Sequence, residues 1–119
     1  MAVRKCRRGE IYMADLNPIV GHEQGGCRPV LIIQNDIGNL HSPTTIVAPL
    51  TASFTQRVYP TEVRVKAGTA ELPKDSSILL NQIKAIDKRR LEKYVGRLDA
   101  GTMRQVDEAI KISLGLVPF

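Results

Sequence analysis

The sequence predicts an α+β fold that is mainly β: a small, mostly antiparallel barrel with one helix at its C-terminal end. Short runs of β-forming residues follow one another closely, and no helices alternate with them as a parallel sheet would require. The one strongly helical pattern lies at the end of the chain. With 119 residues the chain fits a single domain, 1–119, with one core, and a domain this small makes a dimer a reasonable expectation.

Five segments show the period of two, or the buried apolar run, that strands require. These expected strands are 10–16, 29–34, 44–50, 61–65 and 77–83. Residues 30–33 and 78–80 are apolar on both faces, a pattern typical of central, buried strands. Between the second and third strands, residues 35–39 have the Asn, Asp and Gly composition of a turn.

The end of the chain predicts the helix. Before it, residues 87–92 indicate a short helical turn and residues 94–98 a short strand. Asp99 can then cap a helix, and Gly115 can end it. An apolar stripe at helical spacing, expected to pack on the core or on a second copy of the chain, comprises Met103, Val106, Ile110 and Leu114.

The chain is basic, with 17 Lys and Arg against 12 Asp and Glu and a net charge of +5. The excess lies in residues 1–28 and 61–90. It suits a phosphate backbone through counterion release, while an acidic protein partner or a solvated surface explains it as well. No apolar run approaches the ~20 residues that span a bilayer, and no apolar stretch follows the basic N-terminus as in a secretory signal. We therefore expect a cytoplasmic protein.

The cysteines and histidines do not form a metal-binding pattern. Cys6 and Cys27 make no CxxC motif, and neither His22 nor His41 has ligand spacing around it. We therefore expect reduced thiols and no metal site. The loop over 17–28 contains three glycines, whose backbone can adopt positive φ and let a ligand approach closely.

Six stretches carry a family pattern, in order and with few gaps. They are RGEIYMADLNP at 8–18, GHEQGGCRPV at 21–30, QN at 34–35, TIVAPLT at 45–51, DSSILLNQI at 75–83 and ISLGL at 112–116. The Gly-Gly-x-Arg-Pro segment, the strand ending in Thr and the Gln-Ile pair stand at the separations typical of one family. Together these stretches closely resemble the MazF/PemK family of bacterial toxins, and in particular its Gram-positive MazF branch.

The resemblance implies a five-stranded, SH3-like barrel of the CcdB/MazF type, assembled as a homodimer. It also implies the toxin of a type II toxin–antitoxin system, an mRNA interferase that causes growth arrest. Such an endoribonuclease cuts single-stranded mRNA at specific sequences without metal or cofactor, and leaves a 2′,3′-cyclic phosphate and a 5′-hydroxyl. Its partner is an acidic, MazE-like antitoxin whose disordered tail covers the RNA groove.

The resemblance assigns catalysis to Arg28, the arginine of Gly-Gly-x-Arg-Pro, and to Thr51 at the end of the third strand. In this reaction the 2′-oxygen attacks the neighbouring phosphorus, so negative charge builds up on the phosphate. A guanidinium matches two phosphate oxygens, and a hydroxyl donates to one. An arginine pKa above about 12 suits a proton shuttle poorly, so we assign Arg28 to charge stabilisation and leave the acid and base open. Three roles stay open for Glu23: it acts as the base, it orients Arg28 through an ion pair, or it is a solvated carboxylate.

Six further residues are expected to contact RNA: Arg8, His22, Gln24, Asn39, Ser42 and Gln82. Arg8 matches the start of the family's first strand, and the other five can stack on bases or hydrogen-bond them. His22 and His41 also offer the acid–base pair usual for this reaction, since imidazole titrates near neutral pH, but the family requires neither. His22 and Asn81 depart from the residues that relatives commonly carry, so we expect an altered cleavage sequence.

Two other functions remain open. A gyrase poison of the CcdB group shares this fold but acts through C-terminal residues that include a terminal Trp, whereas this chain has no Trp and ends in Val-Pro-Phe. A non-catalytic RNA-binding module needs aromatic platforms, and only 4% of the residues are aromatic. RNA cutting that needs no metal and depends on Arg28 would separate the three functions.

Overall fold

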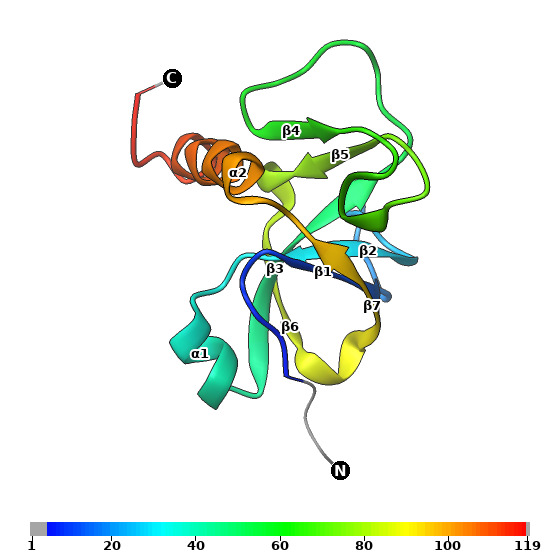
Figure 1. Ribbon diagram of the computed structural model, residues 1–119, viewed down its shortest axis with the longest axis vertical. Coiled ribbons are helices and arrows are strands. Elements are labelled where there is room, and N and C mark those ends of the chain that lie inside the picture. Colours follow the sequence, from blue (N-terminus) through cyan, green and yellow to red (C-terminus); the bar gives the residue numbers. More distant parts are fainter. Residues whose placement is uncertain (1–4, 119) are drawn as a thin grey trace.

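The computed structural model describes residues 5–118, so the first part of the basic N-terminus and Phe119 lie outside it. Over these residues the chain forms a seven-stranded antiparallel sheet with two α-helices (Figure 1). The strands are β1 (Glu10–Asp15), β2 (Cys27–Ile32), β3 (Thr44–Thr51), β4 (Glu62–Val65), β5 (Ser76–Leu79), β6 (Lys84–Asp87) and β7 (Leu91–Arg97). The helices are α1 (Asp36–His41) and α2 (Ala100–Ser113), with 3-10 turns η1 (Thr69–Glu71), η2 (Leu80–Gln82) and η3 (Lys88–Arg90). The expected antiparallel α+β fold with a C-terminal helix is confirmed.

The long strand β3 organises the sheet, whose order is β4-β5-β3-β2-β1-β7 with β6 also on β3. On one edge β3 pairs first with β6, from Thr44 to Val47, and then with β5, at Leu50 and Thr51. On its other edge it pairs with β2, from Val47 to Pro49. The end of β3 therefore lies between β5 and the start of β2.

Both faces of the central strands are buried. Leu31 and Ala48 pack in a core that includes residues of α2, whereas Val30, Ile32 and Val47 pack in a second core on the other face. All five side chains are fully buried. This confirms the expectation that the second strand is covered on both sides, and it makes β2 and β3 a rigid base for the residues at their ends.

Helix α2 begins and ends where the sequence predicts. The side chain of Asp99 accepts from the N–H of Thr102 at 2.7 Å, and Gly115, at φ +74°, follows the last turn. Val106 is fully buried, but Leu114 is 59% exposed, because it is the capping residue at the end of the helix. Leu114 therefore does not pack on the core of this chain, and its packing against a second copy stays a prediction. No helix in the described part of the chain is both long and apolar enough to cross a membrane.

Some short elements differ from the expectation. Residues 35–39 do not form a turn but begin α1, whose N-cap Asn35 accepts from the N–H of Gly38 at 2.8 Å. The strand expected over 77–83 ends at Leu79, where η2 turns the chain into the unexpected β6. The sheet thus has seven strands over residues 5–118 rather than the five that the resemblance implies. Elements this short depend on caps and long-range pairing more than on local pattern.

Candidate functional site

Four polar residues lie in one row across four neighbouring strands. Ser77 on β5 pairs with Thr51 on β3 on one side and with Arg64 on β4 on the other. The β2–β3 register, continued two residues beyond its last pair, places Arg28 opposite Thr51. Residues directly opposite each other in an antiparallel sheet share a face. The fold therefore brings together Arg28 and Thr51, the two residues that the family resemblance singles out.

The guanidinium of Arg28 is held by neutral backbone acceptors. Its Nε donates to the carbonyl of Gly25 at 2.7 Å, and its Nη1 donates to the carbonyl of Leu50 at 3.2 Å. Among residues 5–118, Arg28 makes no ion pair and its Nη2 makes no hydrogen bond. The positive charge is thus fixed in direction without being neutralised by a carboxylate, which is the condition for binding an anion.

Two glycines allow the chain to turn back under this guanidinium. A Cβ on Gly25 would come within 2.5 Å of the Ile19 side chain, so the loop packs closely at that point. Gly26 has φ +77°, a conformation that glycine adopts without strain. The tight turn brings the Gly25 carbonyl into reach of Arg28, two residues after Gly26.

Thr51 stands where β3 ends and the exposed loop 52–61 begins. Its hydroxyl accepts from the N–H of Ser53 at 3.1 Å and lies 3.3 Å from the Ser53 carbonyl oxygen, to which it donates. The hydroxyl is therefore held in a turn, next to the peptide group that contacts Arg28.

A cleft of about 570 Å³ opens beside Thr51. Its polar lining includes the basic Lys74 and Lys93, the acidic Glu71 and the hydroxyl-bearing Tyr94. Arg28 does not line this cleft, but its guanidinium donates to the carbonyl of Leu50, a residue that does. The site is thus a surface that extends to both sides of Thr51, with a basic cleft on one side and the Arg28 guanidinium on the other.

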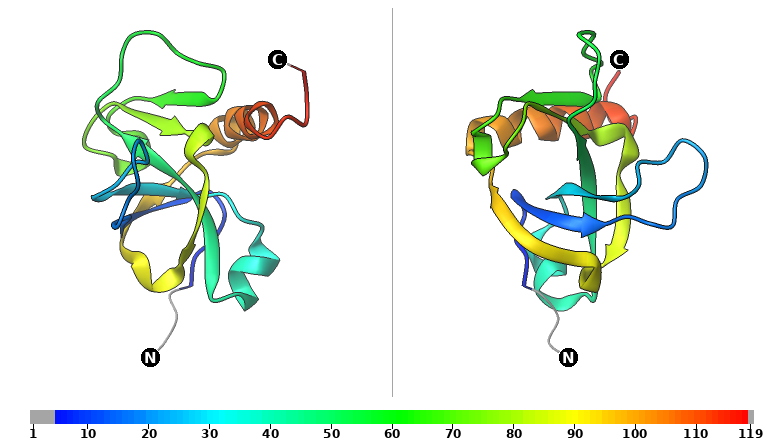
Figure 2. Two further views of the ribbon diagram at one scale, coloured as in Figure 1. Left: turned by 180° about the vertical axis from the view of Figure 1, so that it is seen from behind. Right: turned by 90° about the vertical axis from the view of Figure 1, so that its right-hand side faces the viewer.

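The loop between β1 and β2 stands away from the barrel (Figure 2) but is tied to it at two places. Gln82 on η2 accepts from the N–H of Gln24 at 2.9 Å and donates to the carbonyl of His22 at 3.4 Å. At the start of the loop, Arg90 donates to the carbonyl of Asn17. Gln82 therefore positions the loop, a role that the predicted base contact of this residue did not include.

Glu23 does not orient Arg28. Its carboxylate accepts from the N–H of Val20 at 2.8 Å, and its own N–H donates to the Val20 carbonyl at 3.3 Å, so Glu23 closes a turn within the loop. The orienting role is therefore wrong. The base role stays a prediction, as does a contact of the exposed His22 with RNA.

Asn39 and Ser42 lie near the start of β3, at the opposite end of that strand from the row. Asn39 is 3% exposed, and its amide donates to the carbonyl of Gln34 and accepts from the hydroxyl of Thr45. A buried amide engaged in this way cannot read a base edge, so the predicted RNA contact of Asn39 is wrong. Ser42 shares a hydrogen bond with the hydroxyl of Thr44 at 3.0 Å and is likewise remote from Arg28.

Arg8 is used inside the fold, and its predicted RNA contact stays a prediction. Its Nε donates to the carbonyl of Ile33 at 2.8 Å, and its Nη2 pairs with Asp107 on α2 at 2.6 Å. Its backbone N–H donates to the carboxylate of Asp36, which lowers the pKa of Asp36. His41, at the end of α1, belongs to this distant region, so the structure does not bring it together with a histidine of the β1–β2 loop.

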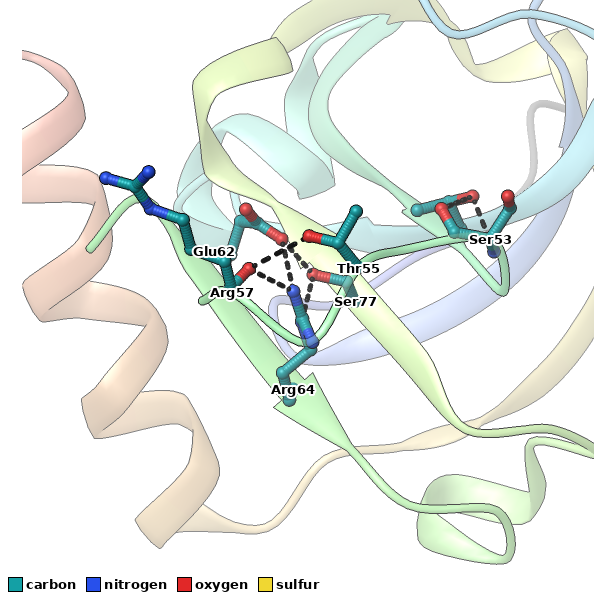
Figure 3. Close-up of polar contacts among 7 residues, drawn as sticks. Ser53, Thr55, Arg57, Glu62, Arg64 and Ser77 are labelled. Atoms are coloured by element: carbon teal, nitrogen blue, oxygen red, sulfur yellow. Dashed lines mark hydrogen bonds and ion pairs between the residues drawn. The ribbon is translucent and has the colours of Figure 1, made fainter. Parts of the chain in front are cut away.

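The structure adds residues that the sequence did not point to (Figure 3). Arg64 donates to the hydroxyl of Ser77 at 3.1 Å and to the carboxylate of Glu62 at 3.2 Å, while Ser77 donates to Glu62 at 2.8 Å. The alternation in 61–65 placed the side chains of Glu62 and Arg64 away from the core. It could not show that Arg64 stands in line with Ser77 and Thr51, with Glu62 beside it.

Cys27, directly before Arg28, is not activated. Its exposed thiol donates to the carboxylate of Glu92 at 3.2 Å, and this hydrogen bond raises the pKa of the thiol. The thiolate, which is the nucleophilic form, is therefore disfavoured. Across the described part of the chain, no group of three or more His, Cys, Asp and Glu side chains is gathered as a metal ion would need.

Comparison with known proteins identifies the family. Residues 7–114 match the model of PemK-like, MazF-like toxins of type II toxin–antitoxin systems. The chain belongs to this family. It is 53% identical over 113 residues to Endoribonuclease EndoA of Bacillus subtilis (strain 168), a match that covers 95% of this chain and 97% of that protein. The resemblance to the MazF branch is confirmed, and the enzyme class of this MazF-type chain is endoribonuclease.

Solved structures of MazF-like proteins share the fold. A mycobacterial endoribonuclease, solved with its cognate antitoxin, has a TM-score of 0.77 and 28% identity, with 96% of this chain and 98% of that chain covered. MazF of Deinococcus radiodurans has a TM-score of 0.81 at 24% identity, covering 94% and 98%, and shows likeness of fold alone.

Proposed function

We propose that this MazF-type endoribonuclease is the toxin of a type II toxin–antitoxin pair and cuts single-stranded mRNA at specific sequences without a metal ion. The observation that supports this most is the guanidinium of Arg28, which no carboxylate neutralises among the described residues and which is tied to the peptide before Thr51. The chain acts in the cytoplasm, as a single domain over 1–119.

In the proposed reaction the ribose 2′-oxygen attacks the adjacent phosphorus and the bond from phosphorus to the 5′-oxygen breaks. The products are a 2′,3′-cyclic phosphate and a 5′-hydroxyl. The Nη2 of Arg28 donates to the phosphate oxygens, and the hydroxyl of Thr51 donates to one of them in place of the Ser53 carbonyl. Donors aimed at developing charge each contribute about 10²–10³-fold in rate.

Two protons must also move. The 2′-hydroxyl gives its proton to a base, and the departing 5′-oxygen takes one from an acid. Glu23 and His22 are the titratable groups of the exposed loop that ends at Arg28, so they are the candidates for these steps. Substitution of each, followed by the pH dependence of kcat, assigns the roles.

The rest of the RNA follows the surface around Thr51. Lys74 and Lys93 in the adjoining cleft suit the phosphates, and Tyr94 offers a ring for a base. On the other side, base edges meet the β1–β2 loop and η2, where Gln24 and the exposed Asn81 stand. Contacts there from Gln24, His22 and Gln82 belong to the same proposal.

The partner we infer is an acidic, MazE-like antitoxin. The mycobacterial relative was solved with its cognate antitoxin, and Deinococcus MazF was solved with MazE. An acidic tail complements the net charge of +5 and competes with RNA for the same basic surface. We also propose a homodimer, in keeping with a domain of this size.

The decisive experiment digests a long unstructured RNA with the purified protein in EDTA and maps the new ends by sequencing. We expect cuts at a few short motifs, with 5′-hydroxyl ends, and loss of cutting in Arg28→Ala, whose folding is checked by circular dichroism. Cutting that needs added Mg²⁺, or an active Arg28→Ala, would overturn the mechanism. Binding without cutting would indicate an RNA-binding module, and inhibition of gyrase without cutting would indicate a CcdB-type poison.

A further inference from the structure

The loop 52–61, which follows Thr51 and crosses to β4, is rich in aromatic residues for this chain. It holds both Phe54 and Tyr59, although the whole sequence has only three Tyr and two Phe. Both rings are exposed, Phe54 by 39% and Tyr59 by 48%. The loop contains Arg57 and no acidic residue, so its own charge favours an anionic chain.

Arg64 holds this loop from below (Figure 3). Its Nη2 donates to the carbonyl of Arg57 at 2.9 Å. Its guanidinium carbon lies 4.2 Å from the centre of the Phe54 ring. The loop is thus attached to β4 through one backbone group and one aromatic face. Such a cation–π contact is strongest where the cation is partly withdrawn from water, as it is here, since the Arg64 side chain is 21% exposed.

Arg64 is itself fixed by its neighbour in the row, Ser77, and by Glu62. Its Nε donates to the hydroxyl of Ser77, and its Nη2 donates to Glu62, whose side chain is only 12% exposed. Ser77 pairs directly with Thr51 across the β5–β3 ladder. A continuous set of contacts therefore runs from Thr51 through Ser77 and Arg64 to Phe54.

We propose that Phe54 is a stacking platform for a nucleobase near the scissile phosphate, and that Arg64 is the residue that positions it. This inference rests on the proposed function, because it assumes an RNA strand at Thr51. Arg64 covers one side of the ring, which leaves the exposed side for a base. Nucleobases stack on aromatic rings without regard to sequence, and a cation behind the ring adds to the attraction.

Steady-state kinetics on an oligoribonucleotide with one mapped cleavage motif test the proposal. Phe54→Leu removes the ring but keeps an apolar side chain, so we expect KM to rise roughly tenfold, the loss of one stacked base, with kcat unchanged. Arg64→Gln should raise KM by a similar factor. Combined with Phe54→Leu it should add nothing further, because both substitutions disrupt the same contact. Lys66→Gln, an equal loss of charge at an exposed position just beyond β4, is the matched control and should leave KM unchanged.

A binding test does not depend on cleavage. Since the chain has no Trp, Phe54→Trp introduces a single indole fluorophore that keeps the stacking face. The probe is the same oligoribonucleotide with a 2′-O-methyl group on the attacking nucleotide, which cannot be cut. We expect its binding to quench the indole fluorescence of the Phe54→Trp variant, and an abasic nucleotide at the stacked position to abolish the quenching. Ile37→Trp, exposed on the distant α1, should not respond.

Unchanged KM in both single variants, or Phe54→Trp fluorescence that ignores saturating probe, would overturn the inference. Proportional losses of kcat and thermal stability in Arg64→Gln, without a change in KM, would overturn it as well, since they indicate a merely structural residue. These outcomes differ from failure of the proposed function, in which the wild-type protein itself does not cut RNA.

Discussion

Replacing Arg28 with lysine keeps the positive charge and removes the planar fork. In the structure two N–H groups of the fork hold the carbonyls of Gly25 and Leu50, and Nη2 remains for a phosphate. A lysine ammonium on a flexible stem cannot satisfy two carbonyls and at the same time meet two phosphate oxygens. Arg28→Lys therefore affects both the local structure and the reaction.

The two effects have different sizes. Hydrogen bonds such as those to Gly25 and Leu50 contribute about 0.5–1.5 kcal/mol each, so the free energy of unfolding should fall by about 1–3 kcal/mol. In the reaction, a donor aimed at the developing charge is lost, which lowers kcat by about 10²–10³-fold, or about 3–4 kcal/mol in the activation free energy. We expect kcat to fall much more than KM rises, because the charge on the phosphate is greatest in the transition state.

Single-turnover cleavage of a fluorogenic oligoribonucleotide measures the rate, and urea unfolding measures the stability. Arg104→Lys is the matched control, since it makes the same substitution at an exposed position of α2 and should change neither quantity. A kcat for Arg28→Lys within about threefold of wild type, less than about 1 kcal/mol, would refute the assignment of the fork to the transition state.

Three further predictions test other parts of the structure. On β7, a Cβ at Gly96 would lie 2.1 Å from the backbone carbonyl oxygen of Ala70. Gly96→Ala should therefore lower the free energy of unfolding by about 1–3 kcal/mol, and Tm in a thermal scan by roughly 5–10 °C. An unchanged Tm would contradict this packing. The hydrogen bond to Glu92 raises the pKa of the Cys27 thiol, so Glu92→Gln should lower it. In a Cys6→Ala background, the pH midpoint of alkylation by iodoacetamide should move downwards and the reaction at pH ~8 should be faster. A slower reaction would mean that the hydrogen bond is not formed in solution. Affinity for the uncut RNA analogue should fall steeply with added salt, as measured by fluorescence anisotropy, and a flat salt dependence would argue against phosphate contacts by Arg28, Lys74 and Lys93.

Local signals in the sequence were sufficient where the chain interacts with its near neighbours. The helix between Asp99 and Gly115 could be predicted because its capping hydrogen bond and its left-handed end both form within a few residues. The buried strand over 30–33 was equally clear, since apolar residues on both faces leave no exposed side. Even so, α1 was missed, because a helix of six residues depends on a cap such as Asn35 rather than on periodicity.

The site was predicted only in part, for a different reason. Arg28 and Thr51 were found through a resemblance to a family, and not through any physical signal in the chain. Asn39 and Ser42 were placed beside them because they are polar, and Arg8 because it matches the start of the family's first strand. Neither signal reveals which end of the barrel a residue occupies. The structure places these three near α1 and α2, where Arg8 pairs with Asp107.

What the amino-acid sequence determined by itself was most of the strands, the final helix, the basic charge and the family. Only the tertiary structure decided that Arg28, Thr51, Ser77 and Arg64 stand in line, and that Arg64 supports Phe54. The physical reason is that neighbours along the chain set local conformation, whereas this row depends on the register between strands that are not consecutive in sequence. That register is settled by burying both faces of β2 and β3 at once, which involves the whole barrel.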